Sequence, residues 1–315
     1  MHKIKLFQIF LNFYAKTVDN KKTECYTERV INERHPPRGV TKQIRNQFFI
    51  RRTKTMKKVI KLVTALCLAA IMVVAAVACG ENSADKRETL TVYTNAGFAP
   101  YEYIDDSGNV VGVDIDVMTE IGETLGYKVV VKDVEFNTIL EEVAKSKLAV
   151  GAAGMTKKAE RDEVALASDV YAQSVQYVIA PVGTFEDGAK VTVDQILEKA
   201  GTKTVGVQKG TTGESLIADA NSEKVTSYTN AIVASGDIGT TVAAVVIDKL
   251  PAESIASNNA KLACWEIDAD VENYVIYFNK EATELVKKVN AVLKIMKEKG
   301  VIDYYTMKHT GGIVA

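Results

Sequence analysis

The sequence has little of the residue types that build most reactive centres. Its 315 residues include three histidines and four cysteines, and from Gly80 onward only His309 and Cys264 remain. A lone cysteine cannot form a disulfide within the chain and is usually a small buried hydrophobe. No G-x-S-x-G elbow, P-loop or metal-ligand spacing occurs either. These absences argue against an enzyme, and we expect neither a cofactor nor a metal.

Acidic residues outnumber basic ones in most of the chain, although the net charge of −1 conceals this. Residues 1–55 carry 13 Lys and Arg against 4 Asp and Glu, whereas residues 80–315 carry 23 against 36. Proteins bind nucleic acid through a basic face that neutralises phosphates. The acidic main part of the chain lacks the charge for such a face, so we exclude nucleic acid as a partner.

Residues 56–79 have the layout of a secretory signal: lysines, then an apolar run, then small residues before Cys79. Ala76-Val77-Ala78-Cys79 resembles a bacterial lipobox, in which the cysteine is lipidated and becomes the new N-terminus. The alternative is an uncleaved transmembrane anchor, because the apolar run approaches the length that spans a bilayer. In either case we expect the rest of the chain outside the cytoplasm, held at the outer face of the cell membrane by a tether at residues 80–87.

The segment 1–55 precedes this signal, although a signal belongs at the N-terminus. The simplest explanation is that Met56 is the true start and that residues 1–55 are an over-extended reading frame. Residues 1–79 are therefore left out of the fold prediction.

From Glu88 onward, short β-branched runs alternate with amphipathic segments of helical period. Strands are expected at 89–94, 128–133, 147–153, 174–180, 202–207, 242–247 and 273–278, and helices at 116–125, 138–144, 215–220 and 281–299. Gly126 is expected to end the first helix and Asp114 and Asp116 to cap it, while Thr211 and Glu214 predict a capping box. The alternation predicts parallel sheets covered by helices, in two halves with a ligand cleft between them.

The stretch LTVYTNAGFAPYEYIDDSGNVVGVDIDVMTEIGETLG resembles the opening of the extracellular solute-binding proteins of family 3, which serve polar amino-acid ABC importers. The similarity continues through FNTILEEVAKSKLAVGAAGMTKKAERDE, VGVQKGTTGES, AAVVIDKLPA and VNAVLKIMKEKGVIDYY, and covers residues 89–308. It implies an α/β, two-lobed periplasmic-binding-protein fold (type II), each lobe a mainly parallel sheet covered by helices, with two crossover strands as hinge. Lobe 1 would comprise residues 88–179 and 277–315, and lobe 2 residues 180–276.

Arg161 is the single arginine after Glu88, in a region that otherwise uses lysine. A guanidinium binds a carboxylate through two parallel hydrogen bonds, which lysine cannot do. The resemblance implies that Arg161 binds the carboxylate of a free amino acid with Ala153, Gly154 and Thr156, and we expect Thr156 to cap the helix that carries Arg161. The alternative is a solvated arginine within the charged run KKAERDE.

The resemblance also assigns residues to the rest of the ligand. Asp248, at the end of an apolar strand, would bind the ammonium, the alternative being a helix cap. Phe98 and Phe136 would flank the ligand side chain, although a phenylalanine is more often part of a core.

Polar positions from both lobes complete the expected site. Thr211 and Thr212 would add donors to the carboxylate when the lobes close, although the capping box explains Thr211 without a ligand. Gln208 and Asn95 lie where contacts to the ligand side chain are expected, and they favour a polar side chain.

These features predict the substrate-binding lipoprotein of an ABC transporter. A monomer would capture a free amino acid by lobe closure and deliver it to a membrane permease with a cytoplasmic ATPase. The alternatives are an amino-acid-sensing receptor module and a dehydratase-like enzyme on the same fold. Arg161→Lys is expected to weaken binding more than tenfold.

Overall fold

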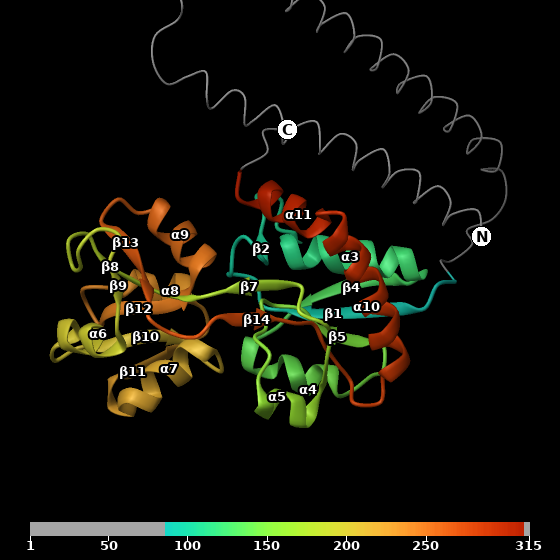
Figure 1. The fold of residues 1–315 in the computed structure, drawn as a ribbon, viewed down its shortest axis with the longest axis horizontal. Helices are drawn as coiled ribbons and strands as arrows, with labels where there is room; N and C mark the ends of the chain where they lie inside the picture. Colours follow the sequence, from blue (N-terminus) through green and yellow to red (C-terminus); the bar gives the residue numbers. More distant parts are fainter. Residues whose placement is uncertain (1–85, 312–315) are drawn as a thin grey trace, which may run out of the picture. The chain divides into compact units, whose positions relative to one another are not determined.

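The computed structural model describes residues 86–311, so the upstream segment, the signal and the lipobox with Cys79 lie outside the described residues. The chain from Arg87 onward forms one compact unit. Within it the described residues form two α/β lobes, each with its own sheet (Figure 1). None of the helices between residues 86 and 311 combines the length and apolar character needed to traverse a bilayer.

Lobe 1 is built around a sheet of five strands in the order β4-β1-β5-β15-β6. Its strands are β1 (Thr89–Thr94), β4 (Lys128–Asp133), β5 (Ala149–Gly151), β6 (Leu166–Ala167) and β15 (Tyr277–Phe278), with a small hairpin of β2 (Tyr103–Ile104) and β3 (Val110–Val111). Its helices are α3 (Val113–Leu125), η1 (Phe136–Thr138), α4 (Ile139–Val143), α5 (Ala159–Val164), α10 (Thr283–Glu298) and α11 (Val301–His309).

The first strands of lobe 1 are parallel, whereas β15 runs antiparallel to both of its neighbours. Helix α3 packs on β4 and contacts α10 and α11, while α4 covers β1 and β5 from the opposite face (Figure 1). Apolar residues of α3 recur at helical spacing and are buried. The helix ends at Gly126 with φ 84°, where its N–H donates to a carbonyl of the last turn, so the predicted C-cap is confirmed.

The acidic residues expected to cap α3 do not do so. The helix begins at Val113 with Gly112 as its N-cap, so Asp114 and Asp116 lie in the first turn. Asp116 instead accepts hydrogen bonds from Lys308 Nζ (2.5 Å) and His309 Nε2 (2.8 Å), and thereby ties α11 to α3. These partners are far away in the sequence, which is why the local capping rule gave the wrong prediction.

Lobe 2 contains a sheet of six strands in the order β11-β10-β12-β8-β13-β9. Its strands are β8 (Gln176–Pro181), β9 (Lys190–Val191), β10 (Thr204–Gln208), β11 (Val225–Tyr228), β12 (Val242–Asp248) and β13 (Leu262–Ile267). Its helices are α6 (Val193–Ala200), α7 (Thr212–Asn221), η2 (Ser222–Lys224), α8 (Ala231–Gly236) and α9 (Lys249–Ser257). Strand β12 is parallel to β10 and antiparallel to β8.

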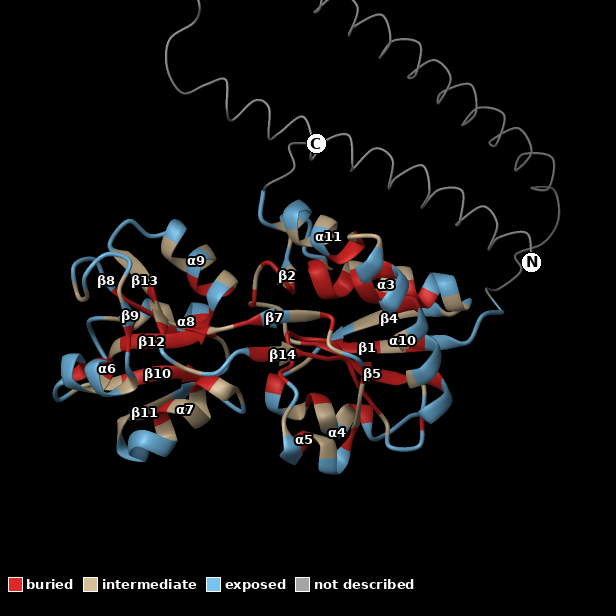
Figure 2. Cartoon of the chain, in the orientation of Figure 1, coloured by how far each residue is buried: buried red, intermediate tan, exposed pale blue. Residues whose placement is uncertain are grey.

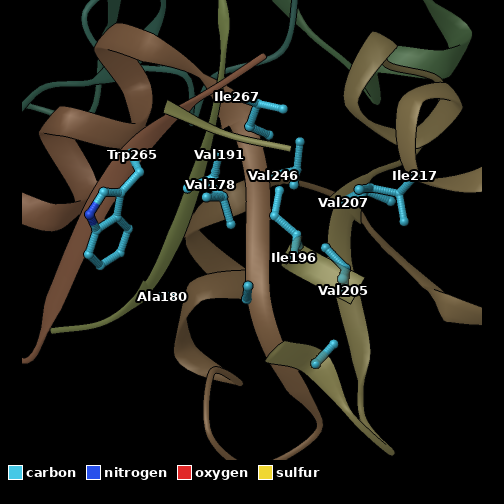
Figure 3. Packing of buried hydrophobic residues seen from close by; sticks show 12 residues of the cluster. Val178, Ala180, Val191, Ile196, Val205, Val207, Ile217, Val246, Trp265 and Ile267 are labelled. Carbon is cyan, nitrogen blue, oxygen red and sulfur yellow. The ribbon is translucent and has the colours of Figure 1, made fainter. Parts of the chain in front are cut away.

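The core of lobe 2 lies between its sheet and helices α6 and α7. Figure 3 shows Val205, Val207 and Val246 of the central strands facing Ile196 of α6 and Ile217 of α7, all with 2% exposure or less. Helices α8 and α9 contact the same strands without entering this cluster. Figure 2 shows burial running along β12, where every residue but one is buried. A strand buried on both faces explains the continuous apolar run VAAVVID.

Two crossing segments connect the lobes: β7 (Ala172–Ser174) and β14 (Glu272–Tyr274), which pair antiparallel. The first crossing lies earlier than expected, because β8 pairs with β12 and β13 of lobe 2 although lobe 1 was predicted to extend to residue 179. The predicted strand 273–278 is split into β14 and β15, because its two ends pair with different sheets. Tyr274 pairs with β7 of the hinge, whereas Tyr277 pairs with β5 and β6 of lobe 1.

Candidate ligand-binding site

One pocket is lined by all of the residues that the sequence analysis assigned to ligand binding. Lobe 1 supplies Asn95, Phe98, Phe136, Ala153, Gly154, Thr156 and Arg161, and lobe 2 supplies Gln208, Thr211, Thr212 and Asp248. Parallel strands β1, β5, β10 and β12 end at this cleft, which is where open α/β sheets collect ligand-binding groups. Glu102 also lines the pocket and was not foreseen.

The Arg161 guanidinium is buried, with 8% of the residue exposed, so the alternative of a solvated surface arginine is wrong. Its Nη1 donates to the carbonyl of Thr156 (2.8 Å) and its Nη2 to the carbonyl of Gly210 in lobe 2 (3.0 Å). The group also lies 5.3 Å from the centre of the Phe136 ring. Burial lowers its pKa from the ordinary value, and the remaining N–H donors are available to an anion.

Thr156 does not cap the helix of Arg161. Helix α5 begins at Ala159 with Lys158 in the N-cap position, and the Lys158 side chain makes no capping hydrogen bond. Residue Thr156 lies earlier, in extended chain that bridges to Tyr274, and its hydroxyl donates to Glu272 Oε2 (2.7 Å). The partner of the Thr156 hydroxyl is therefore on the hinge strand, more than a hundred residues further along the chain, and not at the start of α5 as the sequence predicted.

Asp114 holds the loop on which the lobe 1 side of the pocket is built. Its Oδ2 accepts from the Gly154 N–H (2.8 Å) and its Oδ1 from the Tyr171 hydroxyl (2.6 Å). Burial raises the pKa of Asp114 to about 6, against the lowering effect of these two donors. The carboxylate fixes the backbone of Gly154, which has φ 53° and borders the pocket.

Gly154→Ala should destabilise the protein through two additive effects. A Cβ there would lie 2.6 Å from Phe98 Cε1, in addition to the strain of a left-handed alanine. We expect a loss of about 2–4 kcal/mol in the free energy of unfolding, seen as a fall in Tm of roughly 5–10 °C. Gly188→Ala is the matched control, because Gly188 has φ 74° and open space around it. Equal falls in Tm for the two variants would contradict a packing role for the Phe98 contact.

Phe98 and Phe136 form apolar walls of the pocket. Phe98 is 7% exposed and its ring lies 5.7 Å from that of Tyr101, which in turn meets Tyr274 edge-on at 5.1 Å. Phe136 is 9% exposed and also packs in the core beneath β5. The two rings therefore combine the core role and the pocket role that the sequence left as alternatives.

The lobe 2 turn before α7 closes over Arg161. Thr211 caps the helix, since its Oγ1 accepts from the Glu214 N–H (3.3 Å). The predicted capping box is only half formed, because Glu214 Oε2 accepts from the N–H of Gly210 (2.7 Å) and not from that of Thr211. Gly210 has φ 81°, which lets its carbonyl reach Arg161. The turn thus joins helix capping to contact between the lobes.

A second contact between the lobes is made by the two polar positions expected near the ligand side chain. Gln208 Nε2 donates to Asn95 Oδ1 (2.7 Å) and to the carbonyl of Thr229 (3.0 Å). Together with the Arg161–Gly210 hydrogen bond, this contact shows that the lobes are closed on each other.

Asp248 occupies the N-cap position of α9, but its side chain makes no capping hydrogen bond. Its Oδ1 accepts from the Tyr274 hydroxyl (2.7 Å), and the residue is 6% exposed. Burial, followed by the neighbouring Glu272, raises the pKa of Asp248 well above its usual range. Such a carboxyl is poised to gain from a cation placed in the pocket.

Glu102 is the pocket residue that the sequence analysis missed. It is 1% exposed, and its Oε2 has no hydrogen-bond partner among the described residues. Burial raises its pKa well above the usual range, and nearby Asp114, Asp248 and Asp133 add to the shift. A glutamate between two tyrosines in the apolar run FAPYEYI was the available signal, because a charged residue in such a run needs a partner.

The pocket is therefore lined by the cationic group of Arg161, by the buried carboxyl groups of Asp248 and Glu102, and by the aromatic rings of Phe98 and Phe136. This pattern suits a ligand with one anionic and two cationic groups.

Comparison with known proteins identifies relatives of the whole described region. The sequence profile of the bacterial extracellular solute-binding proteins, family 3, matches residues 90–312. The arginine-binding extracellular protein ArtP of Bacillus subtilis is 28% identical over 79% of this chain and 96% of its own length. An ancestral arginine-binding protein bound to arginine is 33% identical, with a TM-score of 0.63 over 71% of this chain and 98% of the other. An ancestral arginine-binding protein bound to glutamine is 31% identical, with a TM-score of 0.63 and the same coverage.

Proposed function

The chain belongs to the bacterial extracellular solute-binding proteins, family 3, and from this premise we propose that it captures free arginine for an ABC importer. The two-lobed fold and the relatives named for arginine binding support an amino-acid-binding protein. The choice of a cationic side chain is carried by one observation, the unpartnered carboxyl oxygen of Glu102.

The argument from Glu102 is one of desolvation. A buried carboxyl oxygen without a hydrogen bond is costly, and a buried carboxylate without a counterion more so. A guanidinium in the pocket satisfies both needs with charged N–H donors in a planar fork. The aromatic faces of Phe98 and Phe136 favour a flat cation as well. Arginine fits this end better than lysine, whose ammonium is compact and strongly hydrated.

The two ends of the amino-acid backbone have partners in the same pocket. We assign the ligand carboxylate to the free N–H groups of Arg161, supported by the Thr211 and Thr212 turn, and the ammonium to Asp248. Ala153, Gly154 and Thr156 border the carboxylate side. Gln208 and Asn95 stand where their amide oxygens can accept from a guanidinium.

Closure of the two lobes explains how the amino acid is captured. The open form presents the lobe 1 half of the site, and rotation about β7 and β14 brings in Asp248 and the Thr211 turn. Because the ligand then contacts both lobes, it binds the closed form more tightly and shifts the population toward it. The closed form would dock on a membrane permease whose cytoplasmic ATPase drives import, and we propose no catalytic step.

The family places the protein outside the cytoplasm. We further propose that Cys79 carries the lipid anchor and that the protein works as a monomer. The lipobox-like Ala76-Val77-Ala78-Cys79 sequence supports the anchor, and these residues precede the described range.

Glu102→Gln tests the proposed ligand class. By calorimetry, the wild-type protein should bind arginine at least tenfold more tightly than citrulline, its neutral isostere, because only arginine places a cation at Glu102. Glu102→Gln should weaken arginine binding about tenfold or more and leave citrulline within about threefold of its original affinity. The matched control is Glu120→Gln, which changes a carboxylate paired with Tyr305 away from the pocket. Equal binding of arginine and citrulline by the wild type would refute the proposal.

A further inference from the structure

Glu272, on the hinge strand β14, is a buried carboxylate with no place in the predicted site. Its Oε2 accepts from the hydroxyl of Thr156 in lobe 1 (2.7 Å), and its Oε1 accepts from Gln176 Nε2 in lobe 2 (2.8 Å). The same Gln176 nitrogen lies 3.3 Å from Thr212 Oγ1. One carboxylate therefore contacts, directly or through one amide, pocket residues of both lobes.

The same strand also holds the carboxyl group of Asp248. Tyr274 donates to Asp248 Oδ1 (2.7 Å), and the neighbouring Glu272 carboxyl raises the pKa of Asp248. Two buried neighbouring carboxyl groups repel when both are ionised, so a proton on one of them is favoured. Burial and Glu272 raise the pKa of Asp248, which is consistent with the proton residing there.

We propose that Glu272 is a positioning residue for amino-acid capture, which holds Thr156 and Gln176 across the hinge and shares with Asp248 a proton that the incoming ammonium displaces. The exchange is balanced: the ligand arrives as R–NH₃⁺, the protonated carboxyl pair becomes two carboxylates, and one proton leaves to solvent. The inference rests on the proposed amino-acid ligand, although not on the nature of its side chain.

Other charged and titratable groups also face this pair. They are Tyr101, Glu102 and Tyr274 beside Asp248, Lys158 beside Glu272, and Arg161 near both carboxyls. The cations Arg161 and Lys158 favour ionised carboxyls, whereas Glu102 opposes them. Because the pKa of Asp248 remains raised, burial and the contact with Glu272 outweigh the two cations.

Proton displacement fixes how affinity depends on pH. Without ligand, the raised pKa of Asp248 lets this carboxyl keep its proton to higher pH than an ordinary aspartate, and a bound ammonium lowers that pKa. Binding therefore releases a proton at low pH, so affinity rises with pH and levels off above the pKa of the empty form. The pH at the midpoint of that rise therefore measures the pKa of the carboxyl pair in the ligand-free protein.

Two variants move this midpoint in opposite directions. Glu272→Gln removes the repelling charge, so the midpoint for amino-acid binding should fall by about one pH unit. Tyr274→Phe removes a donor that favours the ionised form of Asp248, so the midpoint should rise. The matched control, Glu266→Gln, changes a carboxylate ion-paired with Lys190 in lobe 2 and should leave the midpoint in place.

The experiment is isothermal titration of arginine from about pH 4.5 to 8 in buffers of different ionisation enthalpy, which counts released protons. It is run in the wild-type and Glu102→Gln backgrounds, because Glu102 has a raised pKa of its own. A loss of affinity in Glu272→Gln at every pH with an unmoved midpoint would reduce Glu272 to a structural role and overturn the inference. The absence of proton release at low pH in both backgrounds would do the same. Equal binding of arginine and citrulline by the wild type would instead refute only the proposed ligand class.

Discussion

Arg161→Lys should weaken arginine binding by about 100-fold. Lysine keeps the positive charge but loses the planar fork, so the bidentate contact with the ligand carboxylate cannot form. A hydrogen bond to a charged group in a dry site contributes about 1.5–3 kcal/mol, and lysine also loses the donor to the Gly210 carbonyl that helps hold the lobes together. Calorimetric titration of the wild type and the variant with arginine measures the ratio of Kd values.

Agmatine, which is arginine without its carboxylate, provides the control on the ligand side. The wild type should bind it far more weakly than arginine, and Arg161→Lys should lower its affinity much less than that of arginine, because only the lobe contact with Gly210 is lost. If the variant loses agmatine affinity as strongly as arginine affinity, Arg161 acts on closure alone and not on the carboxylate.

Asp248→Asn should reduce affinity for every α-amino acid by about 100-fold or more. The ammonium would keep a neutral acceptor but lose the charge that compensates its desolvation, a change that costs about 2–5 kcal/mol for a buried pair. Asparagine can still accept from the Tyr274 hydroxyl, so the fold and the hinge contact are kept. Equilibrium titration with arginine and with citrulline should show similar losses for both ligands.

Asp237→Asn is the control for this variant, because Asp237 also accepts from a tyrosine, the Tyr228 hydroxyl, at 2.8 Å but lies outside the pocket. It should leave both affinities unchanged. A loss confined to arginine in Asp248→Asn would place Asp248 at the guanidinium and require the two ends of the ligand to be exchanged.

The strongest predictions from the sequence concerned residues whose chemistry has few substitutes. Arg161 stood out because every other basic residue after Glu88 is a lysine or His309, and it is indeed buried at the cleft. Asp248 could be placed because the end of an apolar strand positions a side chain at the edge of a sheet. Their ligand roles remain proposals, whereas their meeting in one pocket is a structural fact.

The predictions that failed relied on local rules where a distant partner decides. Thr156 and Asp114 each looked like a helix cap, but their partners are Glu272 and the Gly154 N–H, in segments far along the chain. Glu102 and Glu272 gave no capping or spacing signal, because their roles depend on burial and on neighbours from other elements. A local rule does hold at the start of α6, where Thr192 and Gln195 form a capping box.

The position of β15 in lobe 1 has a consequence for how the chain folds. Strand β15 lies between β5 and β6, and within residues 86–311 β6 pairs with no other strand, so the lobe 1 sheet cannot be completed until residues 277–278 are available. Lobe 2 is formed by one uninterrupted stretch between the crossings and needs no such late arrival. During synthesis from the N-terminus, the second lobe can therefore fold while the first still waits for its last strand and its two C-terminal helices.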